Sequence, residues 1–421
     1  RGLGDVYKRQ AQSIADGLRA TNNPLKAYLK EKKHDYDMSA MTPYSSMQGY
    51  GYDFGTKPDG KSPFFFSVNV PDGNYKVTVT LGDKKKPSST VVRAEQRRLM
   101  ADRTDLKKGK FKEISFIVNK RNKAVTLRDS VKINPREVGR PSWDDKLTLE
   151  FNGEAPAVSH ITIEPAGEDV TTVFLCGNST VVDQAYEPWA SWGQMIPVFF
   201  DNSISIANNA ESGQRTSSFI ASRRLDKVLS MAKKGDYILI EFGHNDEKDR
   251  GPGSGAYYNF TTNLKRFIDE ANARGLHPVL LTPTARRKFD SNGKNINTHG
   301  DYVDAVRRVG ERENVPVIEL TDMSTTLYET LGEEGSKKAL VHYPAGSFPG
   351  QDKALADNTH FNTYGAYQIA KCVAEGLKKA APELAVHLVN FSGYNPAQPD
   401  DFETFYWPNS PFSETTKPYG N

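Results

Sequence analysis

Residues 173–180, with the sequence VFLCGNST, decide the fold of the second half of this 421-residue chain. The first four side chains are apolar, as in a short buried strand, and Gly177 ends the run. Comparable apolar runs follow at residues 203–207, 236–242, 277–281 and 315–318. Between them, apolar residues recur at helical spacing over 260–271, 302–309 and 367–377. Short apolar strands that alternate with helices predict βαβ units and a parallel sheet covered by helices on both faces.

The first half of the chain has a different rhythm, from about residue 50 to residue 166. The run 64–70 leads through the turn signal Pro71-Asp72-Gly73-Asn74 into residues 75–81, where apolar and polar side chains alternate. Later runs at 113–118, 147–151 and 159–163 repeat this style. Strands at this spacing predict an all-β antiparallel sandwich or jelly roll. The layout resembles the galactose-binding-like sandwiches that are often attached to carbohydrate enzymes.

These patterns divide the chain into segments. We expect a β-sandwich domain over residues 11–166 and an α/β domain over 170–388. The tail 389–421 is rich in Pro, Asn and aromatic residues, so we expect it to pack along the surface. Residues 1–10 resemble the translated read-through of a sequencing adapter, and we interpret them as a non-native leader. On that interpretation the true start is missing, so the absence of a signal peptide says nothing about export.

The composition excludes several classes of function. Lys and Arg number 55 against 52 Asp and Glu, and a net charge of +3 is too small for a nucleic-acid-binding domain. No apolar stretch approaches the ~18 residues of a membrane-spanning helix. Two Cys residues cannot build a disulfide framework or a Cys-rich zinc site. With 21 Phe and 19 Tyr, the chain has enough core-forming side chains to be globular.

Polar segments follow the predicted strands at their carboxyl ends, where a parallel sheet places its functional loops. Ser179 follows the first strand, Gly213 lies after the second, and Asn245 lies after the third. Asp357 and His360 precede the last predicted helix, and we expect them to share one turn at its entrance. A hydroxyl, an imidazole, a carboxylate and amide donors are the groups that acyl transfer requires.

Together these segments resemble the SGNH (GDSL-type) hydrolases, and within them the rhamnogalacturonan acetylesterases. The resemblance rests on Gly-x-Ser-Thr, Gly-His-Asn-Asp and Asp-x-x-His, and it spans residues 170 to about 379. It implies a flavodoxin-like, three-layer α/β/α domain and a serine esterase that needs no metal or other cofactor. Ser179 would be the nucleophile, His360 the base and Asp357 its acid partner. The N–H groups of Ser179 and Gly213 and the side chain of Asn245 would form the oxyanion hole.

Two positions depart from the family pattern. Asn178 stands where the family usually has Asp before the Ser, which keeps the size of the side chain and removes its charge. Gln214 separates Gly213 from Arg215, where the esterases more often run Gly-Arg-Ser. We therefore expect substrate contacts near Gly213 to differ from those of the family.

The resemblance implies an acetylated pectic polysaccharide as the substrate and a secreted, periplasmic or cell-surface location. Because that polymer is anionic, basic side chains at the strand ends are candidates for binding its carboxylates, and these are Arg215, Arg286 and Arg287. Exposed loop charge is the alternative interpretation of Arg286 and Arg287. Trp192 is a candidate for stacking on a sugar ring, with packing in the core as the alternative.

Other functions stay open at this stage. A lipase, a thioesterase or an acetylxylan-type esterase would use the same scaffold, although the polar and basic loops disfavour a lipid substrate. A polysaccharide-binding protein that has lost its hydrolase activity is an alternative of another class. The presence of Ser179, Asn245 and His360 argues against such a loss.

Overall fold

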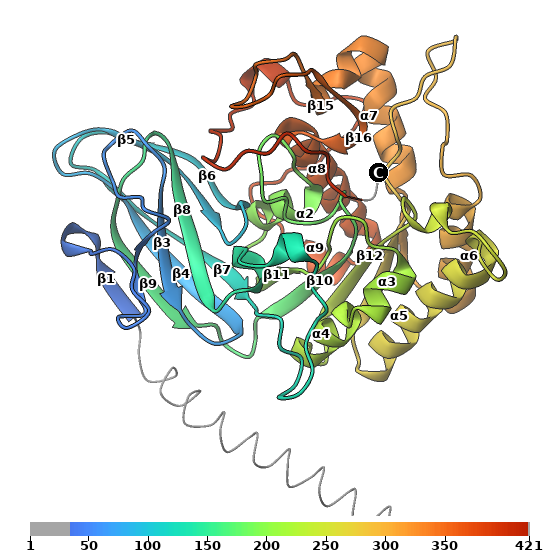
Figure 1. The fold of residues 1–421 in the computed structure, drawn as a ribbon, viewed down its shortest axis with the longest axis horizontal. Helices are drawn as coiled ribbons and strands as arrows, with labels where there is room; N and C mark the ends of the chain where they lie inside the picture. Colours follow the sequence, from blue (N-terminus) through green and yellow to red (C-terminus); the bar gives the residue numbers. More distant parts are fainter. Residues whose placement is uncertain (1–33, 420–421) are drawn as a thin grey trace, which may run out of the picture.

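The computed structural model describes residues 34–419, so the expected leader at residues 1–10 lies outside the described residues. Two parts of different architecture lie side by side (Figure 1). The part up to residue 165 consists mainly of strands, and the part from residue 171 onward alternates strands with helices. This division agrees with the two patterns of apolar residues in the sequence.

Two antiparallel sheets make up the first part, with the strand orders β1-β9-β4-β7 and β2-β3-β8-β5-β6. In β4, Val77, Val79 and Leu81 are buried while the side chains between them are partly exposed, as the alternation predicts. Apolar side chains from both sheets share one core. The strands are β1 (His34–Asp37), β2 (Tyr50–Asp53), β3 (Phe64–Asn69), β4 (Gly73–Gly82), β5 (Ser88–Ala94), β6 (Arg98–Leu106), β7 (Phe111–Lys120), β8 (Lys146–Ala155) and β9 (Val158–Pro165).

The second part is built on a parallel sheet with the order β11-β10-β12-β13-β14. The first strand therefore lies between the second and the third, and the connections leave β10 and β12 in opposite directions across the sheet. Such a switch point opens a crevice at the carboxyl ends of the two strands. The strands are β10 (Thr171–Gly177), β11 (Ile204–Asn208), β12 (Tyr237–Glu241), β13 (His277–Leu281) and β14 (Val317–Ile318), each within two residues of a predicted run.

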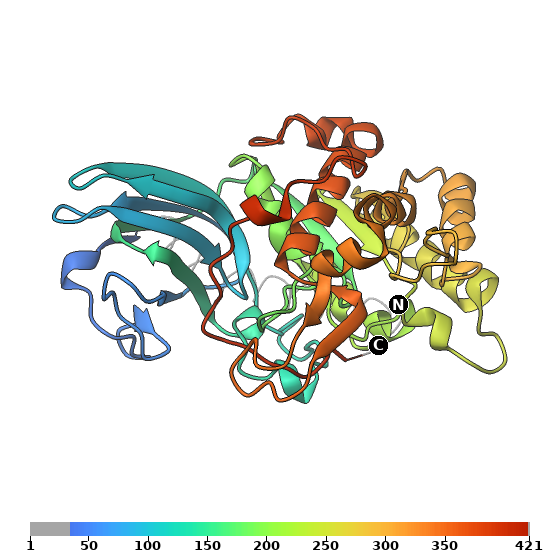
Figure 2. The same cartoon turned by 90° about the horizontal axis from the view of Figure 1, so that it is seen from above.

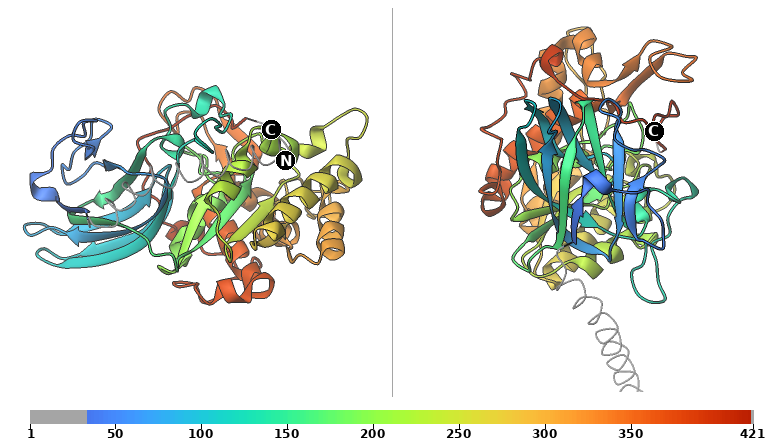
Figure 3. Two further views of the ribbon diagram at one scale, coloured as in Figure 1. Left: turned by 90° about the horizontal axis from the view of Figure 1, so that it is seen from below. Right: turned by 90° about the vertical axis from the view of Figure 1, so that its left-hand side faces the viewer.

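Helices cover both faces of this sheet (Figure 3, left). Because successive side chains of a strand point to opposite faces, Phe174 enters the core under α4, α5 and α6, whereas Leu175 enters the core under α2, α7 and α8. The predicted three-layer α/β/α fold is confirmed. The helices are α2 (Trp192–Met195), α3 (Thr216–Ala221), α4 (Arg224–Met231), α5 (Thr261–Ala273), α6 (Tyr302–Glu313), α7 (Leu320–Gly335), α8 (Thr363–Ala380) and α9 (Pro382–Ala385). A short antiparallel pair, β15 (Leu340–Tyr343) and β16 (Leu355–Phe361), precedes α8.

The turn between β5 and β6 joins the two parts. Arg98 Nε donates to Asp183 Oδ2 at 2.8 Å, and Arg97 Nη1 donates to the carbonyl oxygens of Gln184 and Trp189 at 3.0 and 2.7 Å. Both arginines are almost fully buried. Buried charges require such partners, so the sandwich contributes to the structure of loop 183–190 in the second part.

The tail after Leu388 runs back along the seam between the two parts (Figure 2). The Arg93 guanidinium lies 3.7 Å from the centre of the Trp407 ring, and the ring of Phe412 packs against Phe65 at 5.3 Å. The N–H of Glu187 donates to the carbonyl of Phe412, and the N–H of residue 414 donates to the carbonyl of Glu187, both at 2.9 Å. Aromatic packing and backbone pairing therefore hold the tail along the seam.

Within residues 34–419, no helix combines the length and the apolar character needed to cross a lipid bilayer.

Glu95 in the same turn gives a prediction for stability. Its Oε1 accepts the N–H of Thr148 at 2.9 Å, and burial raises its pKa to about 8 despite the neighbouring Arg98. An unfolded chain ionises this carboxyl near ~4.3, so the folded state binds more protons and loses stability as pH rises from about 4.5 to about 8. Urea unfolding at pH 5 and pH 8.5 should show that Glu95→Gln reduces this loss by at least about 1 kcal/mol. An unchanged pH dependence in the variant would contradict the account.

Candidate active site

Ser179 lies in the turn directly after β10, at the switch point of the sheet. Its carbonyl oxygen accepts hydrogen bonds from Ser191 Oγ at 2.6 Å and from Gln184 Nε2 at 2.9 Å. These two bonds hold the turn, and they leave the hydroxyl directed at another segment. Ser179 Oγ lies 2.9 Å from Nε2 of His360, and both residues are 1% exposed.

Asp357 holds the other side of the imidazole. Its Oδ2 lies 2.8 Å from His360 Nδ1, and its Oδ1 accepts the backbone N–H groups of Thr359 and His360, each at 2.8 Å. Burial alone would raise the pKa of this carboxyl, but the hydrogen bonds and charge of His360, with the two N–H groups, lower it to about 2. Asp357 is therefore ionised at neutral pH and orients the ring.

The expectation that Asp357 and His360 share a helical turn is wrong. Both lie in β16, and α8 begins only at Thr363. The register between β15 and β16 pairs Leu340 with Phe361 but His342 with Ala356, so residues 357–360 lie opposite Val341 alone and form a bulge. A bulge turns side chains away from strict alternation, which brings positions three residues apart together.

The ring of Trp189 packs edge-on against His360, with the ring centres 5.7 Å apart. Its Nε1 donates to the carbonyl of Glu414 in the tail at 2.9 Å, and its own carbonyl accepts from Arg97. The sandwich and the tail therefore both contribute to the position of the imidazole.

Gly213 and Asn245 lie in the loops after β11 and β12, the two strands that flank β10. Gly213 has φ +80, a backbone conformation that favours glycine. A Cβ built on it would also lie 2.4 Å from Tyr419 Cδ1, so a larger residue would clash with that ring. Asn245 Nδ2 donates to the carbonyl of Gln214 at 3.1 Å, which fixes the amide. Both residues line a cavity of about 460 Å³.

Asp246 joins these two loops. Its Oδ1 accepts the backbone N–H of Thr216 at 2.9 Å and the hydroxyl of Thr216 at 2.6 Å. Burial raises the pKa of Asp246 to about 6. The contact ties the segment after β11 to the segment after β12.

Glu241 is a supporting residue that sequence reasoning missed. It ends β12, is fully buried, and accepts hydrogen bonds from Trp192 Nε1 at 2.7 Å and from the N–H of Thr284 at 3.1 Å. The hydroxyl of Thr180 lies 3.0 Å from Glu241 Oε1 and 2.9 Å from Asn178 Oδ1. A neutral Asn178 suits this position because a carboxylate there would lie close to another buried carboxylate. The signal in the sequence is an acidic residue near the carboxyl end of the otherwise apolar run 237–242.

The residues predicted to bind substrate divide into two groups. Arg215 lines the cavity with Gly213 and Asn245, and it pairs with Asp249 at 2.9 Å. Trp192 is 1% exposed, lies in the core and is bonded to Glu241, so the alternative interpretation, packing in the core, is confirmed and the contact with a sugar ring is wrong. Arg286 pairs with Glu247, and Arg287 bonds the carbonyl of Glu333 and the side chain of Asn358. Each of these two guanidiniums is therefore engaged in holding loops together.

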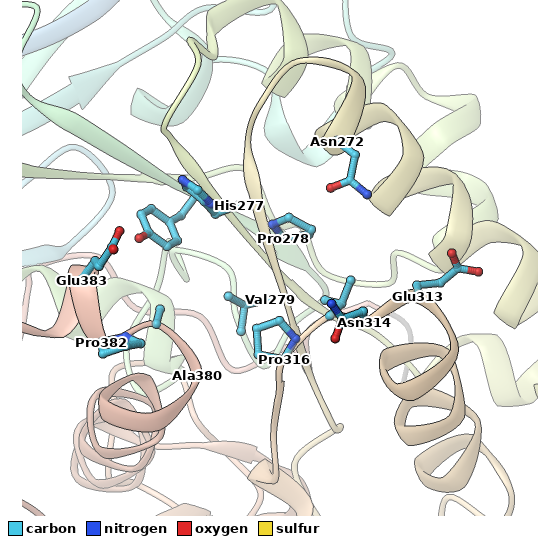
Figure 4. Close-up of a pocket in the computed structure, with 13 residues that line it drawn as sticks. Asn272, His277, Pro278, Val279, Glu313, Asn314, Pro316, Ala380, Pro382 and Glu383 are labelled. Atoms are coloured by element: carbon cyan, nitrogen blue, oxygen red, sulfur yellow. The ribbon is translucent and has the colours of Figure 1, made fainter.

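A second groove lies at the opposite edge of the sheet (Figure 4). It has a volume of about 540 Å³ and includes His277 at the start of β13 and Pro316 just before β14.

Among the described residues, no group of three or more His, Cys, Asp or Glu side chains is arranged to hold a metal ion. The chemistry-bearing side chains named above gather at the carboxyl edge instead.

Comparisons with known proteins agree on the family that this chain resembles. A model of the GDSL-like lipase/acylhydrolase family matches residues 175–369. Over 223 residues the chain is 40% identical to the rhamnogalacturonan acetylesterase RhgT of Bacillus subtilis (strain 168), a match that covers 52% of this chain and 95% of that protein. Over 222 residues it is 30% identical to the probable rhamnogalacturonan acetylesterase YesY of the same strain, covering 52% of this chain and 97% of that protein.

Among solved structures, protein YxiM from Bacillus subtilis is similar over 82% of this chain and 92% of its own. The sequence identity is 23% and the TM-score is 0.47.

Removal of the Glu241 carboxylate should destabilise the site. Glu241→Leu leaves the Trp192 and Thr284 donors buried without an acceptor, so we expect a loss of about 2–5 kcal/mol in the free energy of unfolding. Glu241→Gln keeps one acceptor oxygen and should lose less. Urea unfolding measures both, and a leucine variant as stable as the glutamine variant would contradict this assignment.

Proposed function

This chain belongs to the GDSL-like lipase/acylhydrolase family and is a hydrolase of carboxylic esters, and we propose that it removes acetyl groups from a pectic rhamnogalacturonan. The observation that carries the proposal is the line of hydrogen-bonded side chains from Asp357 through His360 to Ser179. Lys417, which lines the cavity of Gly213 and Asn245, lies 3.9 Å from Asp357 and connects that cavity to the line. The substrate class rests on the relatives named as rhamnogalacturonan acetylesterases. Such a substrate points to a secreted, periplasmic or cell-surface enzyme.

In the proposed reaction, Ser179 Oγ attacks the acetyl carbonyl carbon while His360 Nε2 accepts the hydroxyl proton across the 2.9 Å contact. Asp357 keeps the imidazole in the tautomer with Nδ1 protonated and stabilises the imidazolium that forms. His360 then gives this proton to the sugar oxygen as the C–O bond breaks. Water, activated by the same imidazole, hydrolyses the acetyl-serine and releases acetate.

The negative charge that develops on the carbonyl oxygen needs donors that are already in place. The N–H groups of Ser179 and Gly213 and the amide of Asn245 are the proposed donors. Asn245 is 2% exposed and its amide already donates to Gln214, so it requires little reorganisation during the reaction. Loss of one such donor typically costs ~10²–10³ in rate.

A polar substrate fits the entrance better than a lipid does. The described residues that line the cavity beside Asn245 include Arg215, Lys248 and Lys417. A long acyl chain would require an extended apolar groove. An acetylxylan-type esterase remains the second candidate, and the preference for an acidic polymer separates the two.

The nucleophile assignment is tested by Ser179→Ala. We expect acetate release from p-nitrophenyl acetate to fall by at least ~10³-fold, because the atom that attacks the carbonyl carbon is removed. Circular dichroism and thermal unfolding should match those of the native chain. Activity that persists in a folded variant would contradict the assignment.

The substrate class is tested by a panel of esters. Acetylated rhamnogalacturonan fragments should be deacetylated with a higher kcat/KM than acetylated xylan fragments of similar length, as followed by mass spectrometry. Among p-nitrophenyl esters, acetate should be preferred to octanoate. A preference for octanoate would favour a lipase, and a preference for xylan would favour the second candidate.

A further inference from the structure

The end of the C-terminal tail enters the proposed active-site cleft. Lys417, Pro418 and Tyr419 line the same cavity as Gly213 and Asn245. Lys417 Nζ lies 3.9 Å from Asp357 Oδ2, the carboxylate that orients His360. These tail residues lie outside the match to the family model, which ends at residue 369.

Contacts at two places hold this part of the tail. At residue 414 the carbonyl accepts Trp189 Nε1 and the N–H donates to Glu187, each at 2.9 Å. At Tyr419 the ring lies against Gly213 on one side, and the guanidinium of Arg136 lies 5.0 Å from its centre. Arg136 also donates to the carbonyl of Ser212 at 2.7 Å, so it links the tail to the Gly213 loop. Lys417 is therefore presented by a segment that is supported on either side of it.

Positive charge converges on the cavity from three segments. Arg215 follows β11, Lys248 follows β12, and Lys417 comes from the tail. Of the described residues that line the cavity, three are cationic and none is acidic, although Asp249, which is not part of the lining, pairs with Arg215. Burial, together with Arg286, Lys417 and Arg215, lowers the pKa of Lys248, while Glu247 opposes the shift.

A carboxylate that enters this cavity would meet cationic donors beside the Asn245 amide. Lys248 Nζ donates to Asn245 Oδ1 at 3.3 Å, so one cation lies directly next to the proposed oxyanion site. Hydrogen bonds between ammonium groups and carboxylates are among the strong interactions of protein sites. In a rhamnogalacturonan, a uronate carboxylate and an acetyl ester occur in the same chain of sugars.

We propose that the C-terminal tail forms one wall of the substrate cleft and that Lys417, with Lys248 and Arg215, binds the carboxylate of a uronate close to the acetylated position. This inference rests on the proposed esterase function and adds a specificity determinant to it. Lys417 is a substrate-binding residue in this account and takes no part in proton transfer.

The test compares Lys417→Gln with Lys84→Gln, a matched variant at an exposed lysine of the β4–β5 loop in the sandwich. The readout is the ratio of kcat/KM for an acetylated rhamnogalacturonan oligosaccharide to kcat/KM for a neutral acetylated xylan oligosaccharide. We expect Lys417→Gln to lower this ratio by about five- to twenty-fold, mainly through KM. Lys84→Gln should keep the native ratio. A ratio within two-fold of native in Lys417→Gln would overturn the proposal.

A shortened chain that ends at Glu414 tests whether the tail forms part of the binding site or obstructs the cleft. If the tail forms part of the binding site, this shortened chain should also have a lowered ratio. A rise in kcat/KM on the acidic oligosaccharide would overturn the proposal, because the tail would then obstruct the cleft.

Binding without turnover separates this inference from the proposed function. Calorimetry with an unacetylated rhamnogalacturonan oligosaccharide should give a Kd that is about five-fold higher or more for Lys417→Gln than for the native chain. Equal Kd values would overturn the carboxylate site even in an active esterase. A weaker Kd in a chain that hydrolyses no ester would support the site while contradicting the esterase function.

Discussion

The contact between Ser179 Oγ and His360 Nε2 is the interaction on which this account depends, and it joins positions 181 residues apart. It requires β10 to be an interior strand of the parallel sheet and the β15–β16 pair to return to the same edge. The order β11-β10-β12 brings the turn after β10 next to the Asn245 loop at the switch point. Ser179 and His360 are both almost fully buried, so the surrounding packing maintains the 2.9 Å separation.

The β-sandwich is structurally joined to this site. Arg97 bonds the carbonyls of Gln184 and Trp189, and the Trp189 ring packs against His360. Glu187, in the same loop, pairs with Arg97 and also accepts hydrogen bonds from Trp407 and Ser410 of the tail. The sandwich, the α/β part and the tail therefore meet at one buried carboxylate. An accessory domain linked only by a flexible connection would have no such shared group.

The sequence predicted the features that depend on local pattern. The α/β strands lie within two residues of the predicted runs because buried apolar runs identify them. Ser179, Gly213 and Asn245 are candidates because they lie in the segments that follow such runs. The bulge at residues 357–360 was missed because it depends on pairing with Val341, which no local pattern encodes. The two interpretations of Trp192 could not be separated by local pattern because its burial depends on a distant acceptor, Glu241. The tail has no periodicity, so its path to Gly213 could be known only from contacts with Glu187, Trp189 and Arg136.

Active-site labelling tests the central contact most directly. A fluorophosphonate reacts rapidly with a serine only when a neighbouring base removes its proton. Peptide mapping by mass spectrometry should find the adduct on Ser179 in the native chain, and the rate of labelling should fall sharply in His360→Ala. An adduct on another serine, or labelling of Ser179 at an undiminished rate without the imidazole, would contradict the account.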